Sequence, residues 1–344
     1  MRSTGSSPCL FLLATMSALA AVPLMGCRDK FTEGKAEVAR LARDLEGNTV
    51  AIRTALSVVA DSARTILERK DQVSTGLFPG REYKFYQDTV YYNPVDDGNG
   101  AMFYTGFVPV REAQKARLLA LEGIVPSLKG IVDAGPTKGL IAQAYLITGD
   151  SLLVFYPFSD LLSYIPPKRD MRTRGVWKKT APDIDPARTP KWDPPYVDTT
   201  GKGYMVDVTC PVDVDGRMEA VGGVDITLNA LNKDLASRAD LKLVLVETRQ
   251  AQILAMSAAA ERFFSVGNVE AFKYLRMIEH AEAISDPVMP DNLILSKTSS
   301  APMRSIWESI GRGEADFALP VGNRRYRARA EYLAETGWVL VLVE

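Results

Sequence analysis

Apolar residues recur at three- and four-residue steps between about Glu33 and Glu68. The stripe contains Val38, Leu41, Leu45, Ile52, Val59 and Ile66, and is completed by Asn48, Ala55 and Ser62. This spacing is typical of an α-helix with one apolar face. It predicts a single helix of about ten turns. Such a helix could be a spine along the whole molecule or the seam of a coiled-coil dimer, where Asn48 could set the register.

Strand and turn signals replace the helical period from residue 72 onwards. Three aromatic runs predict short strands at residues 83–86, 89–92 and 102–104. A helix is expected over residues 111–132, followed by strands at 140–146 and 151–156. Residues 157–203 are rich in Pro, Asp and Arg and show little periodicity. A long irregular segment inside a compact domain is usually functional.

A β-hairpin is predicted around Asp215-Gly216, a strong two-residue turn signal. One face of its first strand is apolar and carries Val206, Val208, Cys210, Val212 and Val214. With a two-residue turn, Asp225 pairs with Val206 and points to this valine face, unless a one-residue bulge reverses the assignment. A carboxylate on an apolar face needs a partner, because its desolvation alone is costly. We therefore expect Asp225 to meet an internal arginine, backbone amides or a cationic ligand.

A second, smaller α/β unit follows a linker helix at residues 231–238. Strands are predicted at residues 241–247, 252–256, 315–320, 324–333 and 338–343, with a helix at 269–283. In the strand at 324–333, Tyr and Ala residues alternate with Arg and Glu, the pattern of a half-buried strand. No catalytic pattern is present in this unit.

The N-terminus resembles an export signal. Residues 9–25 are apolar and follow a short region with Arg2, but the run is short and contains Pro23, so it is typical of a signal peptide. Its last residues, Leu24-Met25-Gly26-Cys27, resemble the bacterial lipobox. The resemblance implies a lipoprotein signal peptide at residues 1–26 and a lipid anchor on Cys27 that would hold the protein on a membrane. The alternative is cleavage near Ala21 with Cys27 unmodified.

Composition narrows the function classes. The 344 residues carry a formal net charge of -1, so there is no electrostatic case for nucleic acid as partner. The three cysteines and the single histidine, His280, fit no zinc spacing, and we expect neither metal nor cofactor. No nucleophile motif accompanies His280, and the paired carboxylates Asp183 and Asp185 lie in a stiff proline-rich loop. We therefore expect a binding protein, not an enzyme.

Three segments resemble, in order, the double Cache sensor domain of bacterial chemoreceptors, histidine kinases and diguanylate cyclases. Asp150–Pro157 resembles the G-x-x-x-x-Y-P strand of that family, and Asp170–Lys179 its R-x-W-Y-K segment. Trp192–Asp198 and Val221–Leu228 resemble its P-Y-x-D and G-V-D-I signatures. The resemblance implies an α+β fold with a long N-terminal helix and two PAS-like antiparallel-sheet modules. It divides the chain into an anchor and helix (27–75), a membrane-distal module (76–228), a linker (229–240) and a membrane-proximal module (241–344).

The same resemblance implies a binding site in the distal module. In members that bind amino acids, the matching positions suggest that Arg174 holds the ligand carboxylate, while Tyr196 and Asp225 hold the amine and Asp198 lies nearby. The tryptophan–tyrosine pair of the family aligns with Val176-Trp177 here, so the carboxylate end of the pocket is altered.

Other interpretations of the site residues stay open. Trp177 could stack on a ligand or pack in a lid, Arg174 could form a surface ion pair, and Asp198 could cap a turn. We expect an amino-acid-, amine- or carboxylate-like ligand between the polar loop and the valine face.

The expected protein is thus an extracytoplasmic small-molecule-binding lipoprotein facing the periplasm or the exterior. Arg28 follows Cys27, which favours the outer membrane if the cell is Gram-negative. The chain shows no output domain, so signalling would require a separate protein or a homodimer through the long helix. The alternative is a ligand-free structural or partner-docking envelope lipoprotein.

Overall fold

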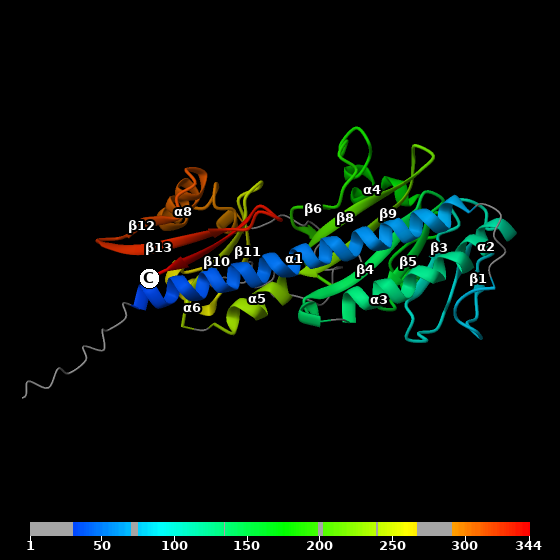
Figure 1. Ribbon diagram of the computed structural model, residues 1–344, viewed down its shortest axis with the longest axis horizontal. Coiled ribbons are helices and arrows are strands. Elements are labelled where there is room, and N and C mark those ends of the chain that lie inside the picture. The colour runs from blue at the N-terminus through cyan, green and yellow to red at the C-terminus, as the bar shows by residue number, and fades with distance from the viewer. Residues whose placement is uncertain (1–29, 70–74, 134, 199–201, 239, 267–290) are drawn as a thin grey trace, which may run out of the picture.

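The computed structural model describes residues 30–69, 75–133, 135–198, 202–238, 240–266 and 291–344. The predicted signal peptide, the anchor Cys27 and the helix expected at residues 269–283, which would carry His280, lie outside these ranges. The described chain forms an elongated molecule in which helix α1 (Lys30–Glu68) runs beside two separate sheets (Figure 1).

Helix α1 confirms the predicted long helix and its role as a spine. It has 39 residues and packs on both sheets. Its buried stripe includes Val38, Leu41, Leu45, Ile52, Leu56, Val59, Ala63 and Leu67. Asn48 and Ser62 lie half-buried at the edge of this stripe. Most of the stabilisation of such a helix comes from burying one face against the sheets, because helix propensity alone is weak.

The larger sheet is antiparallel and, within the described residues, contains nine strands. Its order is β1 (Lys84–Tyr86), β2 (Val90–Tyr92), β3 (Ala101–Tyr104), β5 (Leu152–Tyr156), β4 (Ile141–Thr148), β9 (Arg217–Thr227), β8 (Tyr204–Val214) and β6 (Lys191–Trp192). Strand β7 (Tyr196–Val197) also pairs with β8. This sheet and its helices are called the larger module below.

Two helices join β3 to β4 where the sequence predicts one. They are α2 (Glu112–Leu121) and α3 (Val125–Asp133), separated by the 3-10 turn η1 (Glu122–Ile124). The break has a physical reason: Pro126 lacks a backbone N–H and is tolerated in the first turn of a helix but not in its interior. Both helices pack in the same core as α1.

The loop over the other face of the larger sheet contains short helical pieces. They are η3 (Leu161–Ser163), η4 (Met171–Thr173) and α4 (Gly175–Lys179), while η2 (Gly135–Thr137) precedes β4. A second apolar cluster lies under this loop, separate from the core that α1 covers.

The predicted hairpin forms, but its register corrects one expectation. Asp215 and Gly216 make the turn with φ of 49° and 74°. The ladder then shifts between Val212 and Asp213, so Asp225 pairs with Asp207 and not with Val206. The prediction that Asp225 lies on the valine face is therefore wrong. A bulge at Glu219 reverses the face, since successive residues of a strand point to opposite sides.

The two glycines of β9 show which residues of this strand face α1 and which face the opposite side of the sheet. A Cβ at Gly222 would lie 3.1 Å from Leu56 of α1, whereas a Cβ at Gly223 would lie 2.3 Å from the ring of Tyr145. Gly222 thus faces the helix, and Gly223 leaves room for Tyr145 on the opposite face. Asp225 follows Gly223 by two residues and shares its face.

The smaller sheet is also antiparallel, with the order β11 (Gln252–Met256), β10 (Lys242–Glu247), β14 (Trp338–Val343), β13 (Arg324–Tyr332) and β12 (Asp316–Val321). Helix α5 (Leu228–Ala236) links it to the larger sheet. Helices α6 (Ala258–Phe264) and α8 (Ala301–Gly311) and the turn η6 (Asp291–Leu293) were not predicted. One long helix followed by two antiparallel sheets confirms the α+β fold class predicted from the sequence.

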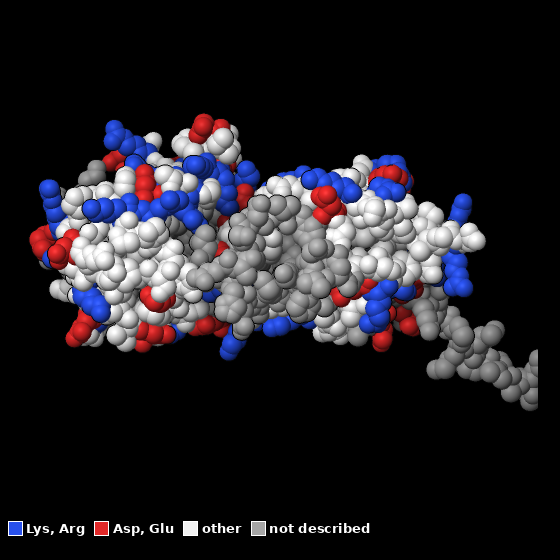
Figure 2. Space-filling model, turned by 180° about the vertical axis from the view of Figure 1, so that it is seen from behind, with Lys and Arg blue, Asp and Glu red and all other residues white. Residues whose placement is uncertain are grey.

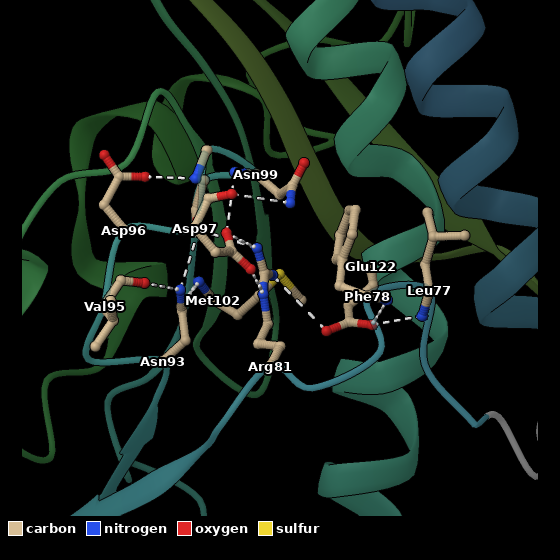
Figure 3. Close-up of polar contacts among 12 residues, drawn as sticks. Leu77, Phe78, Arg81, Asn93, Val95, Asp96, Asp97, Asn99, Met102 and Glu122 are labelled. Atoms are coloured by element: carbon tan, nitrogen blue, oxygen red, sulfur yellow. Dashed lines mark hydrogen bonds and ion pairs between the residues drawn. The ribbon is translucent and has the colours of Figure 1, made fainter.

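A buried polar cluster ties the start of the larger module to α2 and α3 (Figure 3). Arg81 donates to both carboxylate oxygens of Asp97, at 2.7 and 2.8 Å, and its side chain is 2% exposed. Glu122 accepts the backbone N–H of Leu77 at 2.6 Å and the hydroxyl of Tyr83 at 2.5 Å. Arg81 lowers the pKa of Asp97 through their hydrogen bonds. These contacts serve the fold, because they join neighbouring segments of the chain through buried polar groups.

Charges of both signs are spread over the rear face of the molecule (Figure 2). Such mixing agrees with the formal net charge of -1. Of the helices that the structure describes, none combines the length and the apolar character that a membrane span requires.

Candidate functional site

A cavity of about 470 Å³ lies on the face of the larger sheet that points away from α1. Its floor comes from β4, β5, β8 and β9, and its roof comes from the loop between β5 and β7. Gln250, in the turn between β10 and β11, closes the side towards the smaller sheet. The volume lies within the range of about 300–1,000 Å³ that is usual for small-molecule sites.

One end of the cavity is apolar. It is lined by Tyr145, Ile147, Leu153, Phe155, Leu161, Ile165, Met171 and Val176. The rings of Tyr145 and Phe155 are stacked, with centroids 6.2 Å apart. This end can bury the hydrocarbon part of a ligand, at about 25 cal/mol per Å² of apolar surface.

Asp225 and Asp207 are the most buried carboxylates of the polar end, each with 1% exposure. The amide of Gln143 donates to Oδ2 of Asp225 at 2.5 Å, whereas Oδ1 of Asp225 is buried and accepts no hydrogen bond from the residues that the structure describes. Burial and the negative charge of Asp207 raise the pKa of Asp225 well above its usual value, and the Gln143 amide and the Tyr196 hydroxyl only partly oppose them. An orphan carboxylate oxygen that faces a cavity is a strong acceptor for a ligand cation.

Asp207, next to Asp225 across the ladder, belongs to an ion cluster. Nζ of Lys179 lies 2.7 Å from Oδ2 of Asp207 and 2.9 Å from Oδ2 of Asp193. Burial raises the pKa of Asp207 to about 6, although Lys179 acts in the other direction. Burial opposes the charge of Lys179, but the two carboxylates outweigh it and raise the pKa of its ammonium.

Four of the five predicted pocket residues line the cavity: Arg174, Tyr196, Asp198 and Asp225. Burial and the nearby Arg169 lower the pKa of Arg174. Asp198 is buried, and its Oδ2 also accepts the backbone N–H of Lys202 at 3.2 Å, so it closes a turn as well as facing the cavity.

The fifth predicted residue, Trp177, stands apart from the cavity wall. Its ring lies against the turn at Gly149, where a Cβ would be 3.5 Å from the indole, and its neighbour Val176 faces the cavity instead. The indole therefore packs beside the pocket and supports the wall from outside.

Sequence reasoning missed the residues that complete the polar end: Gln143, Lys179, Asp193 and Asp207. Asp207 had a visible signal, because it is a lone carboxylate in the otherwise apolar run Tyr204–Val208. Lys179 and Asp193 had none, since thirteen intervening positions separate them and only the loop path brings them together. In the part of the chain that the structure describes, no cluster of three or more His, Cys, Asp or Glu side chains could hold a metal ion.

The roof of the cavity also contacts the smaller module. Trp192, which precedes Asp193, donates from its indole to Glu335 at 3.2 Å and packs edge-on against Trp338. Arg249 donates to the carbonyl of Trp192 at 2.7 Å. The segment that supplies Asp193 to the cavity is therefore held by the other module.

Comparison with known proteins gives structural matches only. No family model matches the sequence, and no curated protein matches it. The sensory domain of the Campylobacter jejuni chemoreceptor Tlp3 with isoleucine bound is 12% identical, with a TM-score of 0.44 over 93% of this chain and 97% of that chain. The ligand-binding domain of the Pseudomonas aeruginosa chemoreceptor PctC with GABA is 15% identical, with a TM-score of 0.42 over 91% and 97%.

A third match is the ligand-binding domain of the Pseudomonas fluorescens chemoreceptor CtaA with L-isoleucine, at 14% identity and a TM-score of 0.37 over 63% of this chain and 74% of that chain. All three are ligand-binding or sensory domains of chemoreceptors. The fold assignment for this chain rests on its own helix and the order of its two sheets.

Proposed function

We propose that this chain is an extracytoplasmic sensor-type binding protein whose cavity holds a small molecule with a protonated amine and an apolar body. The observation that carries the proposal is Asp225, a 1% exposed carboxylate of the cavity wall whose Oδ1 has no hydrogen-bond partner among the described residues. Burying such an oxygen costs about 1–3 kcal/mol. A ligand ammonium removes this cost and replaces it with a charge-assisted hydrogen bond.

Each of the remaining wall residues would contact a different group of the ligand. Tyr196 lies beside Asp225 and can complete the amine contact, while Asp198 adds negative charge at the same end. Arg174 lies in the roof, where it can meet a ligand carboxylate or carbonyl. The stacked rings of Tyr145 and Phe155 face the apolar body. The ligand class is therefore an amine with a hydrocarbon part, with or without a carboxylate.

The proposal includes the location of the protein. Residues 1–26 would direct export, and acylated Cys27 would anchor the chain with residues 76–228 distal and residues 241–344 proximal to the membrane. A bound ligand would be reported to a separate signalling protein or through a homodimer of the long helix. Metabolic labelling with a fatty-acid analogue tests the anchor: the label should disappear in Cys27→Ser, and label retained in that variant contradicts it.

Thermal-shift and calorimetric screening of the chain without its first 27 residues tests the ligand. The panel contains primary amines, amino acids and carboxylates of similar size. We expect amines with an apolar body to bind and Asp225→Asn to abolish the response. Asp183→Asn is the matched control, because Asp183 is an exposed aspartate in the loop above the cavity and does not line the cavity.

Two results would contradict the proposal. One is a ligand that binds wild type and Asp225→Asn equally well. The other is a complete lack of response, accompanied by a stable homo-oligomer, which would favour the structural or partner-docking role instead.

A further inference from the structure

A lysine enters the carboxylate end of the cavity from α4, where a bound amine would also find its acceptors. Nζ of Lys179 lies 2.9 and 2.7 Å from the two carboxylate oxygens of Asp207 and 2.9 Å from Oδ2 of Asp193. The hydroxyl of Thr209 donates to the same Asp193 oxygen at 3.1 Å. One cation thus serves two carboxylates on the cavity wall.

The carboxylates on the cavity wall outnumber its cations. Four carboxylates line it, namely Asp193, Asp198, Asp207 and Asp225, against the cations Arg174 and Lys179. A third cation, Lys202, lies behind Gln143 and donates to its Oε1 at 2.7 Å.

We infer that Lys179 is a tethered cation that restricts the cavity to ligands with one positive charge and excludes diamines. The inference rests on the proposed amine site at Asp225. Asp207 and Asp225 are paired positions on neighbouring strands, so their Cβ atoms lie about 4.5–5.5 Å apart. A diamine with one ammonium on Asp225 could therefore place its second ammonium near Asp207, where it would compete with Lys179.

Two ammonium groups cannot share this place without a penalty. Like charges a few ångströms apart in a partly buried site weaken binding by about tenfold or more. Lys179 is well held, because it bonds to both Asp207 and Asp193. The preference for monoamines over diamines therefore depends on repulsion by Lys179 as well as attraction by Asp225. Specific binding sites commonly combine both.

The test compares cadaverine with n-pentylamine, which have the same carbon chain and differ in one ammonium group. Binding is measured by calorimetry at about pH 8 on wild type, Lys179→Gln and Lys179→Met. Wild type should bind n-pentylamine at least as tightly as cadaverine. Both variants should shift the preference towards cadaverine by about tenfold or more. Lys178→Met is the matched control, since Lys178 is the exposed neighbour on the same short helix, and it should keep the wild-type ratio.

The test can still be interpreted if one of the Lys179 variants fails to fold. Lys179→Met leaves Asp207 without its cation, whereas Gln still offers a hydrogen-bond donor, and the wild-type ratio is measured without any substitution. The double variant Lys179→Gln with Asp207→Asn should return the ratio to the wild-type value. An unchanged ratio in Lys179→Gln, or a wild type that prefers cadaverine, overturns the inference.

The proposed function fails in a different way. If n-pentylamine binds wild type and Asp225→Asn alike, the amine site is wrong while the ratio test can still succeed. If cadaverine binds only the Lys179 variants, the tethered cation is supported whatever the natural ligand is. Amines that bind none of these proteins overturn both proposals.

Discussion

Replacing Asp225 with Asn should stabilise the empty protein at about pH 8 and at the same time weaken amine binding. Burial and the neighbouring Asp207 raise the pKa of Asp225 in the folded protein. The unfolded chain has no such environment, so its carboxyl loses a proton near the ordinary value of about 4. Folded and unfolded states therefore bind different numbers of protons over the interval between the two pKa values.

The sign follows from that difference. As the pH rises from about 4 towards the folded pKa, the unfolded chain is already ionised while the folded protein still holds its proton. The free energy of unfolding then falls by about 1.4 kcal/mol per pH unit and becomes constant above the folded pKa. Asn does not titrate, so the variant lacks this loss. A smaller slope should remain, because burial also raises the pKa of Asp207, to about 6.

The magnitude can be set from the contacts of the side chain. Asn keeps the oxygen that accepts from Gln143 and removes the charge from a group that is 1% exposed. The cost of the orphan oxygen, about 1–3 kcal/mol, is the expected gain in the free energy of unfolding. Each kcal/mol corresponds to about 2–4 °C in Tm for a domain of this size class. Loss of the buried charge pair should weaken amine binding by about 2–5 kcal/mol.

Denaturant unfolding from about pH 5 to pH 9 checks the stability, and calorimetry checks the binding. Asp183→Asn should follow the wild-type curve in both. The reasoning is refuted if Asp225→Asn is less stable than wild type at about pH 8 and has the same pH dependence. In that case Asp225 is a structural carboxylate whose hydrogen bonds are satisfied, and not an acceptor available to a ligand.

Three further substitutions test other parts of the structure. Glu122→Gln should lower the free energy of unfolding by about 2–4 kcal/mol, since a buried acceptor of several hydrogen bonds loses its charge, and an unchanged urea midpoint contradicts this. Gly223→Ala should push the ring of Tyr145 into the cavity and reduce both stability, by about 1–3 kcal/mol, and ligand binding, whereas Gly47→Ala on the exposed side of α1 should be neutral or slightly stabilising. Trp192→Phe should keep the ring contact with Trp338 but lose the hydrogen bond to Glu335, which should lower the free energy of unfolding by about 0.5–1.5 kcal/mol. An unchanged unfolding transition in calorimetry would contradict a stabilising role of this hydrogen bond.

The periodic elements could be predicted because each is specified locally. The apolar stripe of α1 and the strand patterns of both sheets place these elements within a few residues of their observed bounds, except the two-residue strands β6 and β7, which were not predicted. Turn chemistry predicted the Asp215-Gly216 turn for the same reason. The helices α6 and α8 were missed, since seven and eleven residues carry little periodic signal.

The site was harder to predict than the fold, and Asp225 shows why. Its identity as a binding residue followed from chemistry, but its face depended on a bulge at Glu219 that has no sequence signature. One extra residue moved the expected pocket from the helix side of the sheet to the opposite side. Lys179 and Asp193 lie in the irregular loop, whose path is set by tertiary contacts such as those of Trp192.

The bulge and the cavity are physically connected. By reversing the face of β9, the bulge places Asp225 beside Asp207 and away from α1, so two carboxylates share one side of a ladder. Like charges at paired positions destabilise a sheet. The chain offsets only one of them with Lys179 and leaves an oxygen of Asp225 buried without a partner. These two features lower the stability of the empty protein beside a cavity of ligand size. Such a loss of stability is expected at a binding site. Replacing one aspartate of the pair with asparagine should therefore raise the free energy of unfolding and at the same time weaken ligand binding.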